Sequence, residues 1–119
     1  MKATLLLAPK WVLYVTEDGS KGHVPLGEDA GRKLAGLTSG REFGWVKEVA
    51  ESVKGHGVDS FSTLDPQLHQ ALVALGYGSE LLDPYKNRFD RVALAIEVGA
   101  VRSEAEYEEA AREVSMAAT

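Results

Sequence analysis

The chain has 119 residues, of which 45% are hydrophobic and 26% charged, and its formal net charge at pH 7 is −5. This length and composition are typical of one soluble globular domain and exclude a disordered or membrane-embedded chain. The absence of cysteine excludes disulfides and thiolate metal sites and favours a cytoplasmic location, and the acidic balance argues against nucleic-acid binding driven by phosphate neutralisation.

The first part of the chain has the residue pattern of β-strands. The apolar run at residues 3–8 is too short for a secretion signal or a membrane span, so we expect a first strand there. Residues 10–16 alternate large side chains between two faces, as strands do. Residues 17–20 contain an Asp-Gly pair, which suits a tight hairpin turn, and residues 21–26 return. The sequence therefore predicts a β-hairpin over residues 11–26.

From residue 27 onward the apolar residues recur at helical spacing. This spacing predicts helices at about 28–37, 40–54, 66–75, 84–98 and 104–116. The start signals are the capping boxes Ser39–Glu42 and Ser103–Glu106 and the Asp-Pro pairs at 65–66 and 83–84. Residues 55–64 fit either a loop or a short strand at 58–61.

These elements predict an α+β fold. We expect a small antiparallel sheet of two to four strands, built on the N-terminal hairpin, packed against four to five short helices. The whole chain, residues 1–119, is expected to be a single domain that is β-rich over 1–27 and mainly helical over 28–119. The alternation of strands and helices is too weak to predict a doubly wound parallel sheet.

The histidines are the first residues to consider for chemistry, because imidazole is the commonest catalytic acid or base. A candidate ligand pocket is formed by His56, Asp59 and Ser60 of a glycine-containing loop, with His23 of the hairpin. The commoner explanation is a helix cap followed by a strand, with surface histidines. No spacing typical of a metal site, phosphate loop, dinucleotide site or serine triad occurs, so we predict no catalytic residue, metal or cofactor.

The end of the chain is rich in glutamate. Five glutamates and one arginine follow residue 103, and helical spacing collects the glutamates into acidic stripes. A solvated outer face is the usual meaning of such a pattern, and a surface that captures a basic partner is the alternative. Large amphipathic aromatic residues are typical interface anchors, although tryptophans more commonly fill the seam between a sheet and its helices. The predicted partner-binding residues are Glu104, Glu108, Glu109, Trp11, Tyr14 and Trp45.

A short basic cluster precedes the fourth predicted helix. Lys86, Arg88 and Arg91 are interleaved with Tyr85 and Phe89, which resembles a nucleic-acid contact patch. Neighbouring aspartates dilute its charge, and both aromatic residues fit the buried stripe of the predicted helix. We therefore expect nucleic acid not to be the partner.

Three functional hypotheses follow. The first is a non-enzymatic interaction protein, an inhibitor or regulator that engages a basic protein partner through the acidic helical face or the aromatic hairpin. The second is a small enzyme or ligand-binding domain centred on the pocket of His56, Asp59, Ser60 and His23. The third is a homo-oligomeric structural domain that pairs through the hairpin edge or the final helix. The first is favoured, because the sequence carries an acidic helical face and no catalytic motif.

Overall fold

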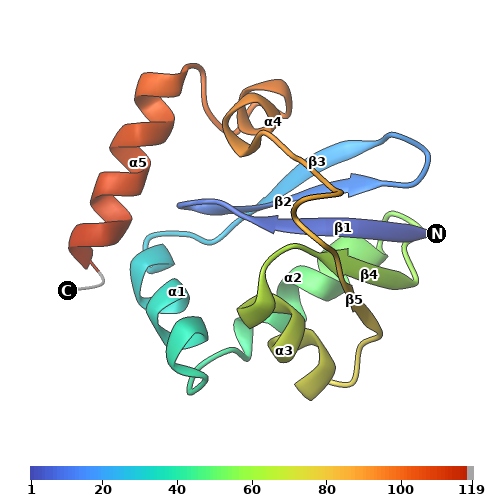
Figure 1. Cartoon of the computed structure of the whole chain (residues 1–119). Coiled ribbons are helices and arrows are strands. Elements are labelled where there is room, and N and C mark those ends of the chain that lie inside the picture. The colour runs from blue at the N-terminus through green and yellow to red at the C-terminus, as the bar shows by residue number, and fades with distance from the viewer. Residues whose placement is uncertain (118–119) are drawn as a thin grey trace.

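A computed structural model describes residues 1–117 and, within them, shows a five-stranded β-sheet in the order β3-β2-β1-β4-β5 (Figure 1). The strands are β1 (Lys2–Leu7), β2 (Trp11–Thr16), β3 (Lys21–Pro25), β4 (Ser60–Thr63) and β5 (Ser79–Leu81). The five helices of the same residues are α1 (Ala30–Ser39), α2 (Trp45–Lys54), α3 (Pro66–Ala74), α4 (Arg91–Glu97) and α5 (Glu104–Ala117). The predicted α+β class is confirmed.

The sheet is mixed. The pairs β1–β2 and β2–β3 are antiparallel, so the predicted hairpin is confirmed. The pairs β1–β4 and β4–β5 are parallel. The prediction of an antiparallel sheet of two to four strands was therefore wrong. Parallel strands need a long connection, which contains α1 and α2 between β1 and β4 and α3 between β4 and β5. No local turn signal reveals such a pairing.

The first predicted capping box does not open a helix. Ser39 is the last residue of α1, where its hydroxyl donates a hydrogen bond of 3.0 Å to the Gly36 carbonyl. Gly40 then takes a left-handed conformation with φ of 70°, which ends the helix. Half of the second capping box is present, because the Ser103 hydroxyl accepts a hydrogen bond of 3.2 Å from the Glu106 amide. The Glu106 carboxylate accepts the amide of Arg102 in place of that of Ser103.

Helix α4 begins later than predicted. Asp90 is its N-cap, and the Asp90 carboxylate accepts a hydrogen bond of 3.0 Å from the Ala93 amide. The Asp83–Pro84 signal opens only a turn. As a result Tyr85 is 87% exposed and Phe89 37% exposed, so the prediction that a helix buries both was wrong.

Each face of the sheet carries its own hydrophobic layer, because successive residues of a strand point to opposite faces. On one face Leu5, Val12 and Phe61 pack against α1, α2 and α3. On the other face Leu6 and Leu13 pack against α4 and the segment that leads to α5. None of the helices in the described residues has the length and apolar character that a membrane span needs.

Helix α5 lies across the end of the sheet and contacts both α1 and α4 (Figure 1). Its inner side chains reach both hydrophobic layers, since Val114 packs against the first layer and Tyr107 against the second. All five glutamates of the helix are exposed. This placement sets an acidic helix beside the turn that joins β1 to β2.

Candidate functional site

An open groove of about 660 Å³ lies between α5 and the β1–β2 turn. Lys10 and Trp11 line one wall, and the charged residues Glu106, Glu109, Arg112 and Glu113 of α5 line the other. The Trp11 ring is only partly buried, so it presents an apolar surface beside a row of carboxylates. Strand β2 fixes the position of Trp11, and the packing of α5 against the end of the sheet fixes the glutamates.

The glutamates of the groove differ in the hydrogen bonds and ion pairs that their carboxylates form. The Glu113 carboxylate forms an ion pair with the Lys10 ammonium. The Glu106 carboxylate accepts a hydrogen bond of 3.2 Å from the Arg102 amide at the start of α5. Glu109 is exposed and has no hydrogen bond or ion pair with any residue from 1 to 117. Glu109 is therefore the carboxylate that is free to meet a ligand.

The structure divides the predicted partner-binding residues. It brings Trp11 and Glu109 together in the groove. Glu104 and Glu108 are exposed on α5 but do not line the groove, because the helical rotation of 100° per residue places them on the other flank. Tyr14 is buried in the core, with 9% exposure.

Sequence reasoning missed Lys10 as a groove residue. Its ion pair with Glu113 joins the first turn of the chain to the last helix. No pattern within a short window of sequence contains both residues. The only sequence signal for Lys10 was its place directly before Trp11, and that place does not point to α5.

Trp45 is the remaining predicted anchor, and it packs against the first hydrophobic layer. Its indole nitrogen Nε1 is buried and has no hydrogen-bond partner among the described residues. A buried donor without a partner costs roughly 1–3 kcal/mol. The side chain therefore contributes packing to the core while carrying a polar group that weakens that contribution.

Replacing Trp45 with phenylalanine is expected to change the free energy of unfolding by less than about 1 kcal/mol, because removing the unpaired donor offsets the lost apolar area. Urea unfolding of the variant and the parent protein measures the difference. Trp45→Ala provides the comparison and should cost about 3 kcal/mol. A loss above about 2 kcal/mol in Trp45→Phe would show that the indole nitrogen is hydrogen-bonded.

A second, smaller cavity of about 300 Å³ lies near the N-terminus, where Met1, Tyr14, Asp18 and His56 contribute to its lining. The His56 and Tyr14 rings are tilted against each other with centroids 5.7 Å apart. Hydrogen bonds from Thr16, and then from Ser20, hold the pKa of Asp18 below its usual value. This cavity contains one imidazole, one phenol and one carboxylate.

The structure does not assemble the predicted ligand pocket. His56 lines the small cavity, whereas Asp59 does not, and the Asp59 carboxylate binds the Met1 ammonium at 2.8 Å. That ammonium also lowers the pKa of Asp59. His23 pairs with Leu13 in the strand register, whereas Gly22 pairs with Tyr14, so His23 lies on the opposite face of the sheet.

Ser60 is the fourth residue of the predicted pocket. It lies in β4, directly opposite Lys2 of β1, and does not line the cavity of His56. The third histidine, His69, is hydrogen-bonded through Nδ1 to the Ser79 hydroxyl at 2.9 Å. Within residues 1–117 no three side chains of the types that bind metals lie close enough to share an ion.

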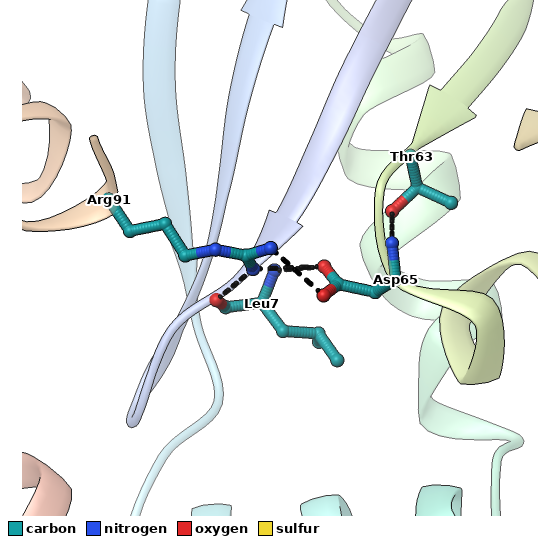
Figure 2. Close-up of polar contacts among 4 residues, drawn as sticks. All are labelled: Leu7, Thr63, Asp65 and Arg91. Atoms are coloured by element: carbon teal, nitrogen blue, oxygen red, sulfur yellow. Dashed lines mark hydrogen bonds and ion pairs between the residues drawn. The ribbon is translucent and has the colours of Figure 1, made fainter. Parts of the chain in front are cut away.

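A third polar cluster lies where the parallel strands β1 and β4 end (Figure 2). The Arg91 guanidinium donates to both carboxylate oxygens of Asp65 at 3.0 Å and to the Leu7 carbonyl at 2.7 Å. Asp65 also accepts the Leu7 amide at 3.0 Å, and its own amide donates to the Thr63 hydroxyl at 3.1 Å. We call these four residues the Arg91 latch.

Ligands of open α/β sheets bind at the carboxyl ends of the parallel strands, so the position of the Arg91 latch is a natural site. Here Arg91 itself occupies that place, and both groups are largely buried, with 29% exposure for Arg91 and 17% for Asp65. Burial raises the pKa of the neighbouring Tyr107, and the charge of Arg91 opposes that shift. Because the charged groups satisfy one another, the latch fastens α4 to the sheet and closes this position.

The groove is therefore the site at which an exposed aromatic side chain and an unoccupied carboxylate face the same open space. No protein-family model matches the chain, and no curated protein is significantly similar to it, so its function has to be inferred from this geometry.

Proposed function

We propose that the chain is a non-enzymatic interaction protein, an inhibitor or regulator, that holds a basic segment of a protein partner in the groove beside α5. One observation carries the proposal: Trp11 and the unpaired carboxylate of Glu109 line the same open groove. A cytoplasmic location, which the absence of cysteine favours, belongs to the same proposal.

This pairing of groups suits a lysine or arginine side chain. The methylene stem of such a side chain lies along apolar surface while its charged end stays with polar groups. The Trp11 ring offers the apolar surface and attracts a cation to its face, and the Glu109 carboxylate offers a charge-assisted hydrogen bond. The chemistry of the groove therefore favours a cation on a flexible aliphatic arm.

The charge of the whole chain supports the same partner class. The net charge of −5 attracts a basic segment over several ångströms and speeds its encounter with the groove. Glu104 and Glu108 are exposed on the outer flank of α5, so they add to this attraction without contacting the occupant. We expect long-range steering from these two residues and short-range binding from Glu109.

One observation favours the alternative of a small-ligand site, and it is the cavity in which His56 meets Tyr14. That cavity lacks His23 and Ser60, which the predicted pocket required. Its carboxylate is also already engaged, since Asp18 is hydrogen-bonded to Thr16 and Ser20. The groove is therefore the better candidate for the binding site.

The proposal is tested with a short fluorescein-labelled peptide rich in arginine, whose binding is followed by fluorescence anisotropy. Glu109→Lys is expected to weaken binding at least about tenfold, because it removes the free carboxylate and adds a like charge. Trp11→Ala is expected to weaken it by a similar factor. The affinity of the unmodified protein should fall as the ionic strength rises.

Glu108→Lys is the matched control, since it makes the same charge change one residue away on the other flank of α5. It should weaken peptide binding only about twofold, through the change in overall charge. If Glu108→Lys and Glu109→Lys weakened binding equally, the attraction would be a property of the net charge and the groove would not be the site.

A further inference from the structure

The turn between β5 and α4 is exposed and has a defined shape. The Asp83 carboxylate accepts a hydrogen bond of 2.9 Å from the Tyr85 amide. The Asp83 carbonyl accepts the Asn87 backbone amide at 3.0 Å and the Asn87 side-chain amide at 3.1 Å. These bonds close the backbone of residues 83–87 on itself, so the turn presents its side chains in a fixed arrangement.

Three of those side chains, Tyr85, Lys86 and Arg88, are exposed. Tyr85 is 87% exposed, more than the other exposed large hydrophobic residues of the described chain. Its neighbours Lys86 and Arg88 are exposed, and neither side chain has a hydrogen bond or ion pair with any residue of the described range.

The side chains of Arg41, Lys47, Arg102 and Arg112 are also exposed and unpaired within the described residues, so the turn is distinguished by Tyr85 beside its two cations. Three lysines, by contrast, are occupied. Lys2, Lys10 and Lys21 each form an ion pair with a glutamate from a distant part of the sequence. Exposed tyrosine and arginine are the residue types that dominate binding energy at protein interfaces. A turn that is already ordered loses little conformational entropy when it binds. Segment 83–89 therefore has the exposed residue types and the preformed backbone that suit binding to another protein.

The turn and the groove are complementary. The turn offers two unpaired cations and an aromatic ring against one carboxylate, that of Asp83. The groove offers the unpaired carboxylate of Glu109 beside the Trp11 ring, and its three carboxylates outnumber its two cations, Lys10 and Arg112. We infer that the basic segment held in the groove is the 83–89 turn of a second copy of this chain. This inference rests on the proposed function and names its partner.

The contact cannot form within one molecule. No residue of the turn lines the groove, and the turn lies over the sheet between β5 and α4, away from α5 (Figure 1). The two surfaces are different, so after the first contact one copy keeps a free turn and the other keeps a free groove. Such head-to-tail contacts build rings or open chains of copies.

Sedimentation velocity at low ionic strength tests the inference. The average mass of the unmodified protein should rise with its concentration, and added salt should reverse the rise. Glu109→Lys with Glu113→Lys makes the groove basic, and Lys86→Glu with Arg88→Glu makes the turn acidic. Each double variant alone should self-associate at least about tenfold more weakly, because its two surfaces now carry like charges.

Mixing the two double variants is expected to restore association, since every contact between unlike copies again joins opposite charges. Arg41→Glu with Lys47→Glu is the matched control, because it makes the same charge change at exposed residues outside the turn. This control should associate like a protein with an intact turn. Circular dichroism of each variant confirms that it is folded.

A protein that stays monomeric at all concentrations would overturn the inference, and so would association that the mixture fails to restore. The peptide titration separates this failure from failure of the proposed function. A monomeric protein that still binds the arginine-rich peptide through Glu109 keeps the proposed function with a different partner. A protein that neither binds the peptide nor self-associates loses both.

Discussion

Replacing Arg91 with alanine is expected to lower the free energy of unfolding by about 3 kcal/mol and the melting temperature by roughly 10 °C. The substitution leaves the Asp65 carboxylate, which is only 17% exposed, without its cation. It also removes the donor to the Leu7 carbonyl, which Arg91 binds at 2.7 Å. Thermal and urea unfolding measure the loss.

Two further variants show whether the loss comes from the Arg91 latch. Arg88→Ala removes an exposed arginine nearby and should change stability by less than about 0.5 kcal/mol. Arg91→Lys should recover only part of the lost stability, because an ammonium cannot make the paired hydrogen bonds that the guanidinium makes with Asp65. Equal stability of Arg88→Ala and Arg91→Ala would mean that the latch does not hold α4 to the sheet.

The largest effect is expected from Phe61→Ala, which should lower the free energy of unfolding by about 4 kcal/mol. Phe61 lies in β4 near the middle of the sheet and is 1% exposed. Its ring meets the Tyr77 ring edge-on, with centroids 5.9 Å apart. Alanine would leave a cavity between the sheet and its helices, and urea denaturation reports the cost.

Leu81→Ala is the comparison for this substitution. Leu81 lies in the edge strand β5 and is 47% exposed, so its truncation should cost less than about 1 kcal/mol. A Phe61→Ala variant as stable as Leu81→Ala would mean that residues 60–63 are a surface connection. A large difference between the two variants supports a central β4, which the sequence left open between loop and strand.

Arg88→Ala and Leu81→Ala are expected to change the free energy of unfolding little because both side chains are exposed. Exposure is decided by the tertiary structure and can differ from what residue spacing predicts. Tyr85 and Phe89 are the clearest example, because their spacing fits a buried helical stripe and the structure exposes them. Asp90 caps α4 in an extended conformation, and Asp83 closes a turn before it. Two start signals stood close together in the sequence, and only the tertiary contacts of α4 selected between them.

Asp65 shows a related limit. It stands at the N-cap of α3, as its position before Pro66 predicts, and has the extended backbone of a cap. Its carboxylate makes no capping hydrogen bond and binds Leu7 and Arg91 instead. The N-cap position of Asp65 could be predicted from the adjacent Pro66. Its partners Leu7 and Arg91 lie far away in the chain, and no local pattern predicts them.

Local sequence by itself determined the hairpin of β2 and β3, most of the helices and the Ser103 cap of α5. Each depends on backbone preferences within a few residues, as when Gly19 takes φ of 88° at the hairpin turn. The tertiary structure alone decided the parallel pairing of β1, β4 and β5, the Arg91 latch, and the placement of Trp11 and Glu109 in one groove. These features join segments that are distant in the chain, and the burial that rewards such contacts exists only after the whole chain has folded.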